Sequence, residues 1–360
     1  MLRLDNVTLQ LSDNTFIDDL SFNVNSGVMV SLLGEDIASK QAIIEAISGF
    51  SSINSGQIII EGQVVAAQGN QVKPHQRGMG VVFSDLALFP HLTVEQNIAF
   101  GLSTNNAKDK TRKIADILTE LMLDAHKLSH INALSAEQKV LVAFARALAT
   151  EPSVVLLEDI FSRVNANERL KLIQKIRNVL KSGNIAAVLA TQDPQDAFAF
   201  SDVMGVIQHR RLLQWDEPAT LYEQPKTQAI AALLGICSFI KAKVQINEDH
   251  CELLTELGVL TTHLQPNLFN GQIVEILIRP FDINIKRLIS SDEGRDPQEL
   301  TAKIGKIINR IYNGSVIQYE VELAVSRSIV TLYSHLKYNF SQGDVIEMGL
   351  CIKKPKVFPL

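Results

Sequence analysis

Residues Ser31 to Ile44 read SLLGEDIASKQAII, and this stretch decides the fold. An apolar run ends at Gly34, and a helix-like segment with a lysine near its start follows. This order matches the phosphate-binding loop G-x-x-x-x-G-K-[ST], which joins a strand to a helix. Gly34 and Lys40 stand at the spacing of that motif, but Ser39 replaces its second glycine and Gln41 its serine or threonine. The stretch therefore predicts a strand–loop–helix unit with altered phosphate chemistry.

The composition indicates a globular protein with enough core for two domains. The 360 residues are 46% hydrophobic and 20% charged, and a domain takes roughly 100–200 residues. The net charge is −5 and basic runs are no longer than a pair, so nucleic acid is not expected as a partner. The three cysteines lack C-x-x-C spacing, so we expect reduced thiols. No window approaches about 18 uninterrupted apolar residues, so we expect neither a secreted nor a membrane-spanning protein.

The pattern along the chain changes near residue 236. Before it, apolar runs of strand length alternate with amphipathic segments at 109–122 and 166–180, which predicts a parallel sheet with helices. After it, short β-rich runs separated by turn signals such as Asn313-Gly314 predict an all-β barrel or sandwich. The polar segment 286–300 is expected to be an exposed loop. We therefore expect an α/β domain over 1–235 and a β domain over 236–360.

Further landmarks, in order, resemble the ATP-binding subunits of ABC importers over almost the whole chain. They are DDLSFNVNSG, VVFSDLALFPHLTVEQNIAFGL, LSAEQKVLVAFARALATEPSVVLLEDIFSRVNA, ATQDPQDAFAFSDVMGVI, LYEQP and IRPFDI. The resemblance is greatest to subunits for iron(III), sulfate, molybdate or polyamines. It implies a P-loop ABC ATPase domain with a helical subdomain at about 86–150, followed by a TOBE domain of OB-like barrels. It also implies ATP and Mg²⁺ as ligands.

The same resemblance implies partners and a location. The partners are the transmembrane permease subunits of an importer and a second ATP-binding subunit, in a homodimer or heterodimer. The location is cytoplasmic, peripheral at the inner face of the cell membrane. The solute is not implied, because in such systems it is selected mostly by other subunits.

The phosphate loop departs from the family pattern. Of three family glycines only Gly34 remains, with Ile37 and Ser39 at the other two positions. A β-branched residue at positive φ is an outlier, so the loop is not expected to take its usual shape. The neighbouring carboxylates of Glu35 and Asp36 each repel a triphosphate by about 1 to 4 kcal/mol.

Two further positions bear on nucleotide affinity. Lys40 either offsets one of the loop carboxylates or is a solvated lysine in the first turn of a helix. Leu11 stands where the family usually has an aromatic ring that stacks on adenine. Leucine supplies apolar cover but no π face.

Positions that hold magnesium and the attacking water in the family are also substituted. Gln41 replaces the metal-binding hydroxyl, Ser84 the Q-loop glutamine and Glu158 the Walker B aspartate, although a glutamate can still ligate magnesium. Asp159 aligns with the catalytic glutamate but is one methylene shorter, and a displacement of about 1 Å can cost on the order of 100-fold in rate. Gln192 replaces the switch histidine, and its ATQD context otherwise predicts a strand end followed by a helix capped by Asp193.

The signature motif of the family, which covers the partner's ATP across a dimer, is altered as well. LSGGQ appears here as Leu134, Ser135, Ala136, Glu137 and Gln138, and the carboxylate of Glu137 would face the γ-phosphate. Asn165 replaces the D-loop aspartate. We therefore expect weak or no hydrolysis.

The segment Leu88–Leu102, LFPHLTVEQNIAFGL, is nearly family-standard. The resemblance implies that Phe89, Pro90, His91 and Leu92 face the transmembrane subunits, whereas the alternative is a loop packed on its own domain. Three hypotheses remain. The chain is a non-hydrolysing subunit that docks on transmembrane partners, a working transport ATPase, or a regulatory protein acting through its C-terminal β domain.

Overall fold

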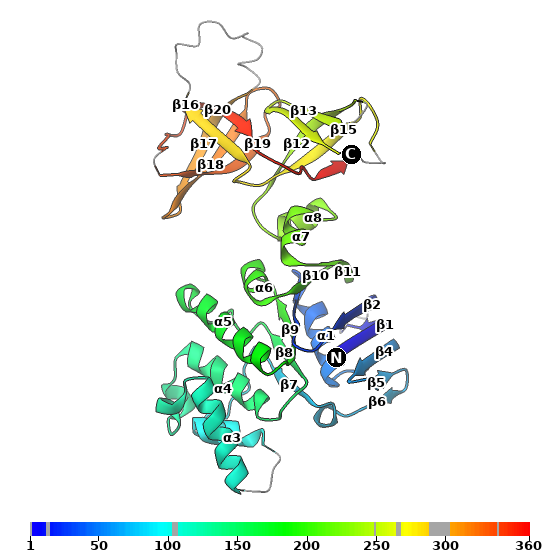
Figure 1. Ribbon diagram of the computed structural model, residues 1–360, viewed down its shortest axis with the longest axis vertical. Helices are drawn as coiled ribbons and strands as arrows, with labels where there is room; N and C mark the ends of the chain where they lie inside the picture. Colours follow the sequence, from blue (N-terminus) through cyan, green and yellow to red (C-terminus); the bar gives the residue numbers. More distant parts are fainter. Residues whose placement is uncertain are drawn as a thin grey trace, which may run out of the picture. The chain divides into compact units, whose positions relative to one another are not determined.

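The strand–loop–helix unit expected at residues 31–44 is present in the computed structural model. Strand β3 (Met29–Leu33) leads through a short loop into α1 (Ile37–Ser48). The structure describes residues 2–11, 15–102, 107–247, 250–263, 268–287, 303–336 and 338–360. The chain divides into two units, Met1–Leu221 and Tyr222–Leu360, and Figure 1 labels their helices and strands.

A six-stranded sheet forms the centre of the first unit. Its order is β11-β10-β3-β9-β8-β7, parallel throughout except for the antiparallel edge strand β11. The central strands are buried on both faces, as their unbroken apolar runs predict. The bounds are β7 (Met79–Val82), β8 (Val154–Glu158), β9 (Ala186–Thr191), β10 (Val203–Gln208) and β11 (Arg211–Asp216).

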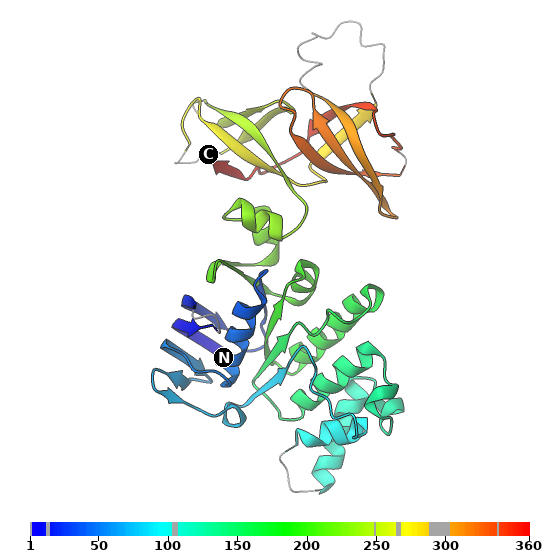
Figure 2. The same cartoon turned by 180° about the vertical axis from the view of Figure 1, so that it is seen from behind.

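A second, antiparallel sheet has the order β2-β1-β4-β5-β6. Helix α1 lies between the two sheets (Figures 1 and 2), and its Ile43, Ile44 and Ile47 are buried in a core with both. The loop before α1 is thereby held at the carboxyl end of β3. The bounds are β1 (Leu2–Gln10), β2 (Phe16–Val24), β4 (Ser55–Ile60), β5 (Gln63–Ala67) and β6 (Asn70–Gln71).

Helices pack on the other face of the parallel sheet and form a second core around Phe144, Phe161 and Phe200. Both amphipathic segments expected from the sequence are helices, displaced by two residues or less at each end. The bounds are α2 (Val94–Phe100), α3 (Ala107–Glu120), α4 (Ala136–Leu148), α5 (Ala166–Ser182), α6 (Pro194–Phe200), and the 3-10 turns η1 (Pro74–Gln76), η2 (Asp124–His126) and η3 (Ile131–Ala133).

The second unit contains two five-stranded antiparallel sheets around one apolar core. Their orders are β14-β13-β12-β15-β21 and β16-β20-β17-β18-β19. The bounds are β12 (Ser238–Ile246), β13 (Cys251–Thr255), β14 (Gly258–Thr262), β15 (Ile273–Ile278), β16 (Ile283–Arg287), β17 (Ile304–Tyr312), β18 (Val316–Leu323), β19 (Ile329–His335), β20 (Val345–Leu350) and β21 (Val357–Pro359).

The division between the units precedes the boundary expected near residue 236, and Arg279 explains why. Its guanidinium donates to the carbonyls of Tyr222 (3.1 Å), Ala231 (2.9 Å) and Gly235 (3.1 Å). These bonds tie the end of α7 (Pro218–Glu223) and α8 (Gln228–Leu233) to β15.

The fold class predicted from the sequence, an α/β unit followed by an all-β unit, is confirmed. The turn predicted at Asn313-Gly314 is present, with Gly314 at a φ of 76° that favours glycine. The loop predicted at 286–300 is wrong for residues 286 and 287, which belong to β16, and residues 288–300 lie outside the described residues. Among the described helices, none combines the length and apolar character that a membrane crossing requires.

Candidate functional site

The loop before α1 is capped by its own carboxylate. Asp36 is the N-cap of α1, with φ −75° and ψ 105°, and its side chain accepts hydrogen bonds from the Ala38 backbone N–H (3.0 Å) and from the Ser39 hydroxyl. Free N–H groups at a helix N-terminus favour anions such as phosphate. Here an anion of the chain itself takes one of these N–H groups, that of Ala38, and also accepts from the Ser39 hydroxyl. Ile37 opens the helix with its side chain 57% exposed.

Gly34 has a packing role that does not depend on any ligand. A Cβ at this position would lie 2.3 Å from the carbonyl oxygen of Ile207 in β10. Since no side chain fits there, glycine is required wherever β3 ends against β10. The retained motif glycine is therefore explained by the fold alone.

Lys40 is buried, which corrects the alternative expectation of a solvated lysine. It is only 4% exposed, and its Nζ donates to the Gly34 carbonyl. Burial lowers the pKa of Lys40 from 10.5 to about 8, while the carboxylates of Asp159, Asp36 and Glu35 raise it in partial opposition. The amine is thus directed into the loop and makes its contact there with a backbone carbonyl.

We expect Lys40→Met to stabilise the protein at neutral pH. Because the pKa of Lys40 is lowered on folding, the unfolded chain binds more protons between about pH 8 and 10.5, so the wild-type free energy of unfolding rises through that window. The variant lacks this slope. Its free energy of unfolding should exceed that of wild type by up to about 3 kcal/mol at pH 7, and this difference should shrink as the pH approaches 10.5.

Chemical denaturation of both proteins between pH 7 and 10 measures this difference, with Lys171→Met on the exposed face of α5 as the matched control. Equal stabilities of wild type and Lys40→Met across the range would contradict the described environment of the amine.

The positions aligned with magnesium ligands have other contacts. The Gln41 amide is directed along α1 to the carboxylate of Glu45 (3.0 Å), and Ser84 is half-buried in the turn that follows β7. Glu158 ends β8, where burial, followed by the charges of Glu45, Asp159 and Asp85, raises the pKa of its carboxyl. These carboxylates repel one another. Within the described part of the chain, no three acidic, histidine or cysteine side chains converge as a ligand set for a metal ion.

Asp159, at the position of the catalytic glutamate, has an unusual backbone. Its φ is 44°, a region uncommon for non-glycine residues, and its N–H donates to the Ala190 carbonyl of β9 (2.8 Å). The side chain is half-buried beside the loop, where its charge acts on Lys40. Asp159 and Lys40 are therefore brought together, as a phosphate site requires.

Gln192 is exposed, and Asp193 caps α6 by accepting from the Gln195 N–H (2.8 Å), which confirms the strand end and capped helix predicted from ATQD. Asp193 also pairs with Arg169 of α5 at 2.8 Å. Buried Asp196 lies 3.8 Å from the same guanidinium. Its pKa rises to about 7, chiefly because it is desolvated and also because it lies near Asp193. These contacts join α5 to α6.

The residues aligned with the signature motif lie at the N-terminus of α4. Ser135 is the N-cap of α4, its hydroxyl accepting from the Gln138 N–H (3.2 Å) while the Gln138 side chain accepts from the Ser135 N–H (2.9 Å). This reciprocal capping box satisfies two backbone donors. Glu137 lies in the first turn, where a carboxylate favours the helix, and Ala136 is exposed, whereas Leu134 is buried. Asn165 is exposed at the N-cap of α5 without a side-chain capping bond.

Leu11 is buried with 7% of its surface exposed, in the core shared by α1 and the two sheets. In this conformation the Leu11 side chain packs in the core, and apolar cover of an adenine ring by Leu11 stays a prediction.

The segment Phe89–Leu92, which we call the FPHL loop, is held by a residue that the sequence did not single out. Asn97 of α2 is fully buried, and its amide accepts from the Phe89 N–H (2.9 Å) and donates to the carbonyls of Phe89 (3.1 Å) and Leu92 (3.4 Å). A buried asparagine one helical turn after a cap, in TVEQN, was the available signal. The loop is thus fixed in shape.

The face around the FPHL loop is partly apolar and exposed. Phe89 is half-buried, since its ring lies 4.6 Å from that of Phe100 and 5.4 Å from the Arg146 guanidinium. Phe100 is 68% exposed, and Pro90 and His91 are exposed. Phe89 therefore packs on its own domain, as the alternative prediction held, while its neighbours present the apolar surface.

Basic residues also converge in the second unit. A pocket of about 500 Å³ is lined by Arg279, Lys353, Lys354 and Lys356, together with Phe281 and Asp282. No such convergence was expected from residues 236–360. Because the Arg279 head already donates to backbone carbonyls, its role here is structural.

Comparison with known proteins gives a consistent result. The family model described as ABC transporter matches residues 17–162. The Fe(3+) ions import ATP-binding protein FbpC 2 of Pectobacterium atrosepticum is 31% identical over 79% of this chain and 81% of its own length. The spermidine/putrescine import ATP-binding protein PotA of Chromobacterium violaceum is 30% identical over 97% of this chain and 96% of its own length.

Solved structures share the fold of the first unit. The Clostridium perfringens protein cbiO1, described as part of the ABC transporter complex cbiONQ, aligns with TM-score 0.57 and 20% identity over 61% of this chain and 90% of its own. The ATP-binding cassette MJ0796, solved as a dimer bound to ADP and Pi, aligns with TM-score 0.52 and 21% identity over 61% of this chain and 99% of its own. By its relatives over nearly its whole length, the chain belongs to the ABC transporter family of ATP-binding proteins.

Proposed function

We propose that this chain is an importer subunit that docks on transmembrane permease subunits and has lost most or all ATP hydrolysis. The observation that carries the proposal is the self-capped phosphate loop. Asp36 occupies the Ala38 N–H, a donor at the helix end where a phosphate would bind, and also holds the Ser39 hydroxyl, while buried Lys40 binds a carbonyl of the same loop. A triphosphate would have to displace a carboxylate and then remain beside it, at a cost that increases as water is excluded.

The remainder of the site supports the same conclusion. Magnesium would meet an amide at Gln41 that already donates to Glu45, and a glutamate at Glu158 whose carboxylate is one methylene farther from the backbone than that of an aspartate. Asp159 is too short to place a water where a glutamate would. The residues present do not fit a hydrolysing Mg·ATP site, whereas the positions that build helices and sheets are intact.

Docking is supported by the face around the FPHL loop and by the relatives. Those relatives are named as ATP-binding proteins of importers for Fe(3+) ions or for spermidine and putrescine, and such subunits act in pairs against permeases. The loop is fixed by Asn97 and flanked by the exposed ring of Phe100. An exposed aromatic ring beside a loop of fixed shape supports a docking role for this face. We place the chain at the inner face of the membrane, in a homodimer or heterodimer, with a C-terminal domain of the TOBE type.

Two alternatives are weighed against this. A working ATPase is favoured by the relatives, which are named as ATP-binding proteins, and by the approach of Asp159 to Lys40, but it requires Asp36 to leave the helix cap. A regulator acting through the second unit would use the basic pocket, whose buried arginine already has structural partners.

We expect Asp159→Asn to leave ATP turnover unchanged. The wild-type chain and the variant are each co-expressed with their permease subunits, and phosphate release is measured in the purified assemblies. Turnover from any active partner subunit is common to both, so the difference isolates this chain. A loss of about 100-fold or more in the variant, the effect expected for a catalytic carboxylate, would show that the site hydrolyses ATP.

A further inference from the structure

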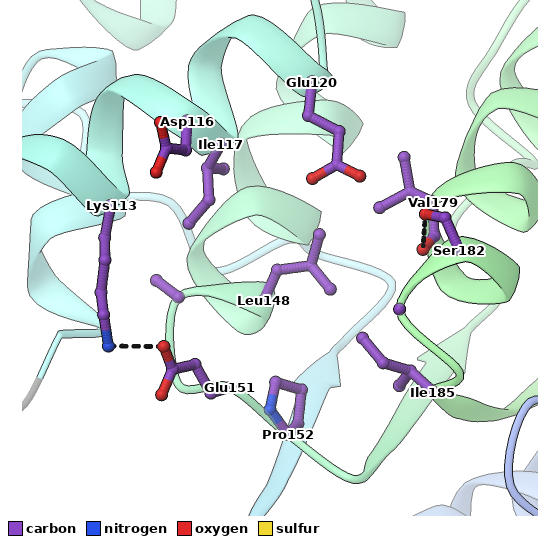
Figure 3. A pocket seen from close by; sticks show the side chains of 12 residues that line it. Lys113, Asp116, Ile117, Glu120, Leu148, Glu151, Pro152, Val179, Ser182 and Ile185 are labelled. Carbon is purple, nitrogen blue, oxygen red and sulfur yellow. Dashed lines mark hydrogen bonds and ion pairs between the residues drawn. The ribbon is translucent and has the colours of Figure 1, made fainter.

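A groove of about 530 Å³ lies on the first unit, and its lining includes neither the residues aligned with the nucleotide site nor those of the FPHL loop. It is bounded by α3, by the segment that follows α4, and by the end of α5 (Figure 3). Its apolar lining includes Leu148, Val179 and Ile185, of which the first two are less than 10% exposed. Apolar side chains thus line a surface depression that no part of the described chain fills.

The rim of the groove is acidic. Asp116 and Glu120, one helical turn apart on α3, are exposed, and within the described residues neither carboxylate forms an ion pair or hydrogen bond. The one lysine of the lining, Lys113, is paired with Glu151 at 2.5 Å across one end of the groove. Three carboxylates therefore face one cation that is already engaged.

Helix ends add to this negative field. Glu120 is the last residue of α3, and the groove also receives the ends of α4 at Leu148 and of α5 at Ser182. The C-terminus of a helix carries partial negative charge and disfavours a carboxylate. The Glu120 carboxylate therefore destabilises its own helix. Its presence at this position is explained if a cation from another molecule pairs with it.

The occupant is selected by this combination of features. Small-molecule sites bury about 70–90% of their ligand, whereas here the rim carboxylates are exposed and the groove is open along α3. A polypeptide segment that keeps one side outside the groove fits better. We propose that this groove binds a basic amphipathic segment of a partner protein, with apolar residues on Leu148 and Val179 and lysine or arginine at Asp116 and Glu120. This is the helix-in-groove mode of recognition, and it does not depend on the nucleotide site.

Three labelled peptides of about four helical turns test the proposal against the whole chain. The first has a leucine stripe flanked by lysines, the second has glutamates in place of the lysines, and the third has the lysine composition in scrambled order. We expect saturable fluorescence anisotropy with the first, and binding at least tenfold weaker with each of the others. Photo-crosslinks from the first peptide should map to α3 and to residues 179–185.

Variants separate groove binding from general attraction to an acidic protein. Asp116→Lys/Glu120→Lys, which reverses the rim, and Ser182→Trp, which fills the groove from an exposed position, should each weaken binding at least tenfold. Asp18→Lys/Glu217→Lys, with the same charge change at exposed positions outside the groove, should bind as wild type does. Equal binding of the scrambled peptide, crosslinks elsewhere, or no saturable binding would overturn the proposal without affecting the account of the nucleotide site.

Discussion

Replacing Phe100 by aspartate should abolish co-purification of the chain with its permease subunits while leaving its melting temperature nearly unchanged. The ring is 68% exposed, so the new carboxylate remains hydrated in the isolated chain, and exposed substitutions usually change stability by about 0.5 kcal/mol or less. In a complex the same carboxylate would be buried against an apolar partner without a counter-charge, which costs several kcal/mol. A loss of about 100-fold or more in affinity follows.

Leu170→Asp is the matched control, because Leu170 is 52% exposed in the same unit but lies on α5, which carries no residue of the FPHL loop or of α2. It should co-purify as wild type does. Phe89→Asp is less informative, since half-buried Phe89 packs against Phe100 and Arg146 and its loss would weaken the fold as well. A Phe100→Asp chain that remains folded and still co-purifies would exclude this face from the contact with the membrane subunits.

The sequence was sufficient for the fold because the fold depends on many residues at once. Unbroken apolar runs such as VVLL at 154–157 can be buried only between helices, and alternation in VIQYEVEL at 316–323 leaves one face for a core. No single substitution reverses such a pattern. The cap at Asp193 was likewise predicted from local chemistry, whereas the cap at Asp36 was not.

The site was less predictable because each of its features depends on one side chain in a three-dimensional setting. A lysine in the first turn of a helix is usually solvated, and only the packing of α1 between two sheets buries Lys40. Gly34 looked like a motif glycine, yet its requirement comes from Ile207, distant in sequence. Asn97 holds the FPHL loop through backbone carbonyls, and Arg146 holds the preceding turn through those of Leu86 and Ala87; the partners of both side chains are set by the folded chain.

Binding of Mg·ATP should be absent or very weak, and this is the central claim. Asp36 caps the start of α1 and accepts from Ser39. Buried Lys40 donates to the Gly34 carbonyl, and Leu11 is buried in the core. Each change removes a favourable contact or adds a negative charge at the place where a triphosphate would lie. Because these effects act on one ligand at one site, their sum is expected to reduce affinity by several orders of magnitude relative to an intact loop.

Thermal unfolding of the purified chain with and without millimolar Mg·ATP tests this most directly, with Mg²⁺ alone as the reference. A ligand present at about 100 times its dissociation constant adds roughly 2.7 kcal/mol to the free energy of unfolding, and each kcal/mol raises the melting temperature by about 2–4 °C for a domain of this size. We predict that Mg·ATP raises the melting temperature no more than Mg²⁺ alone does. A rise of roughly 5 °C or more with Mg·ATP would show that the loop opens to nucleotide and would contradict the account.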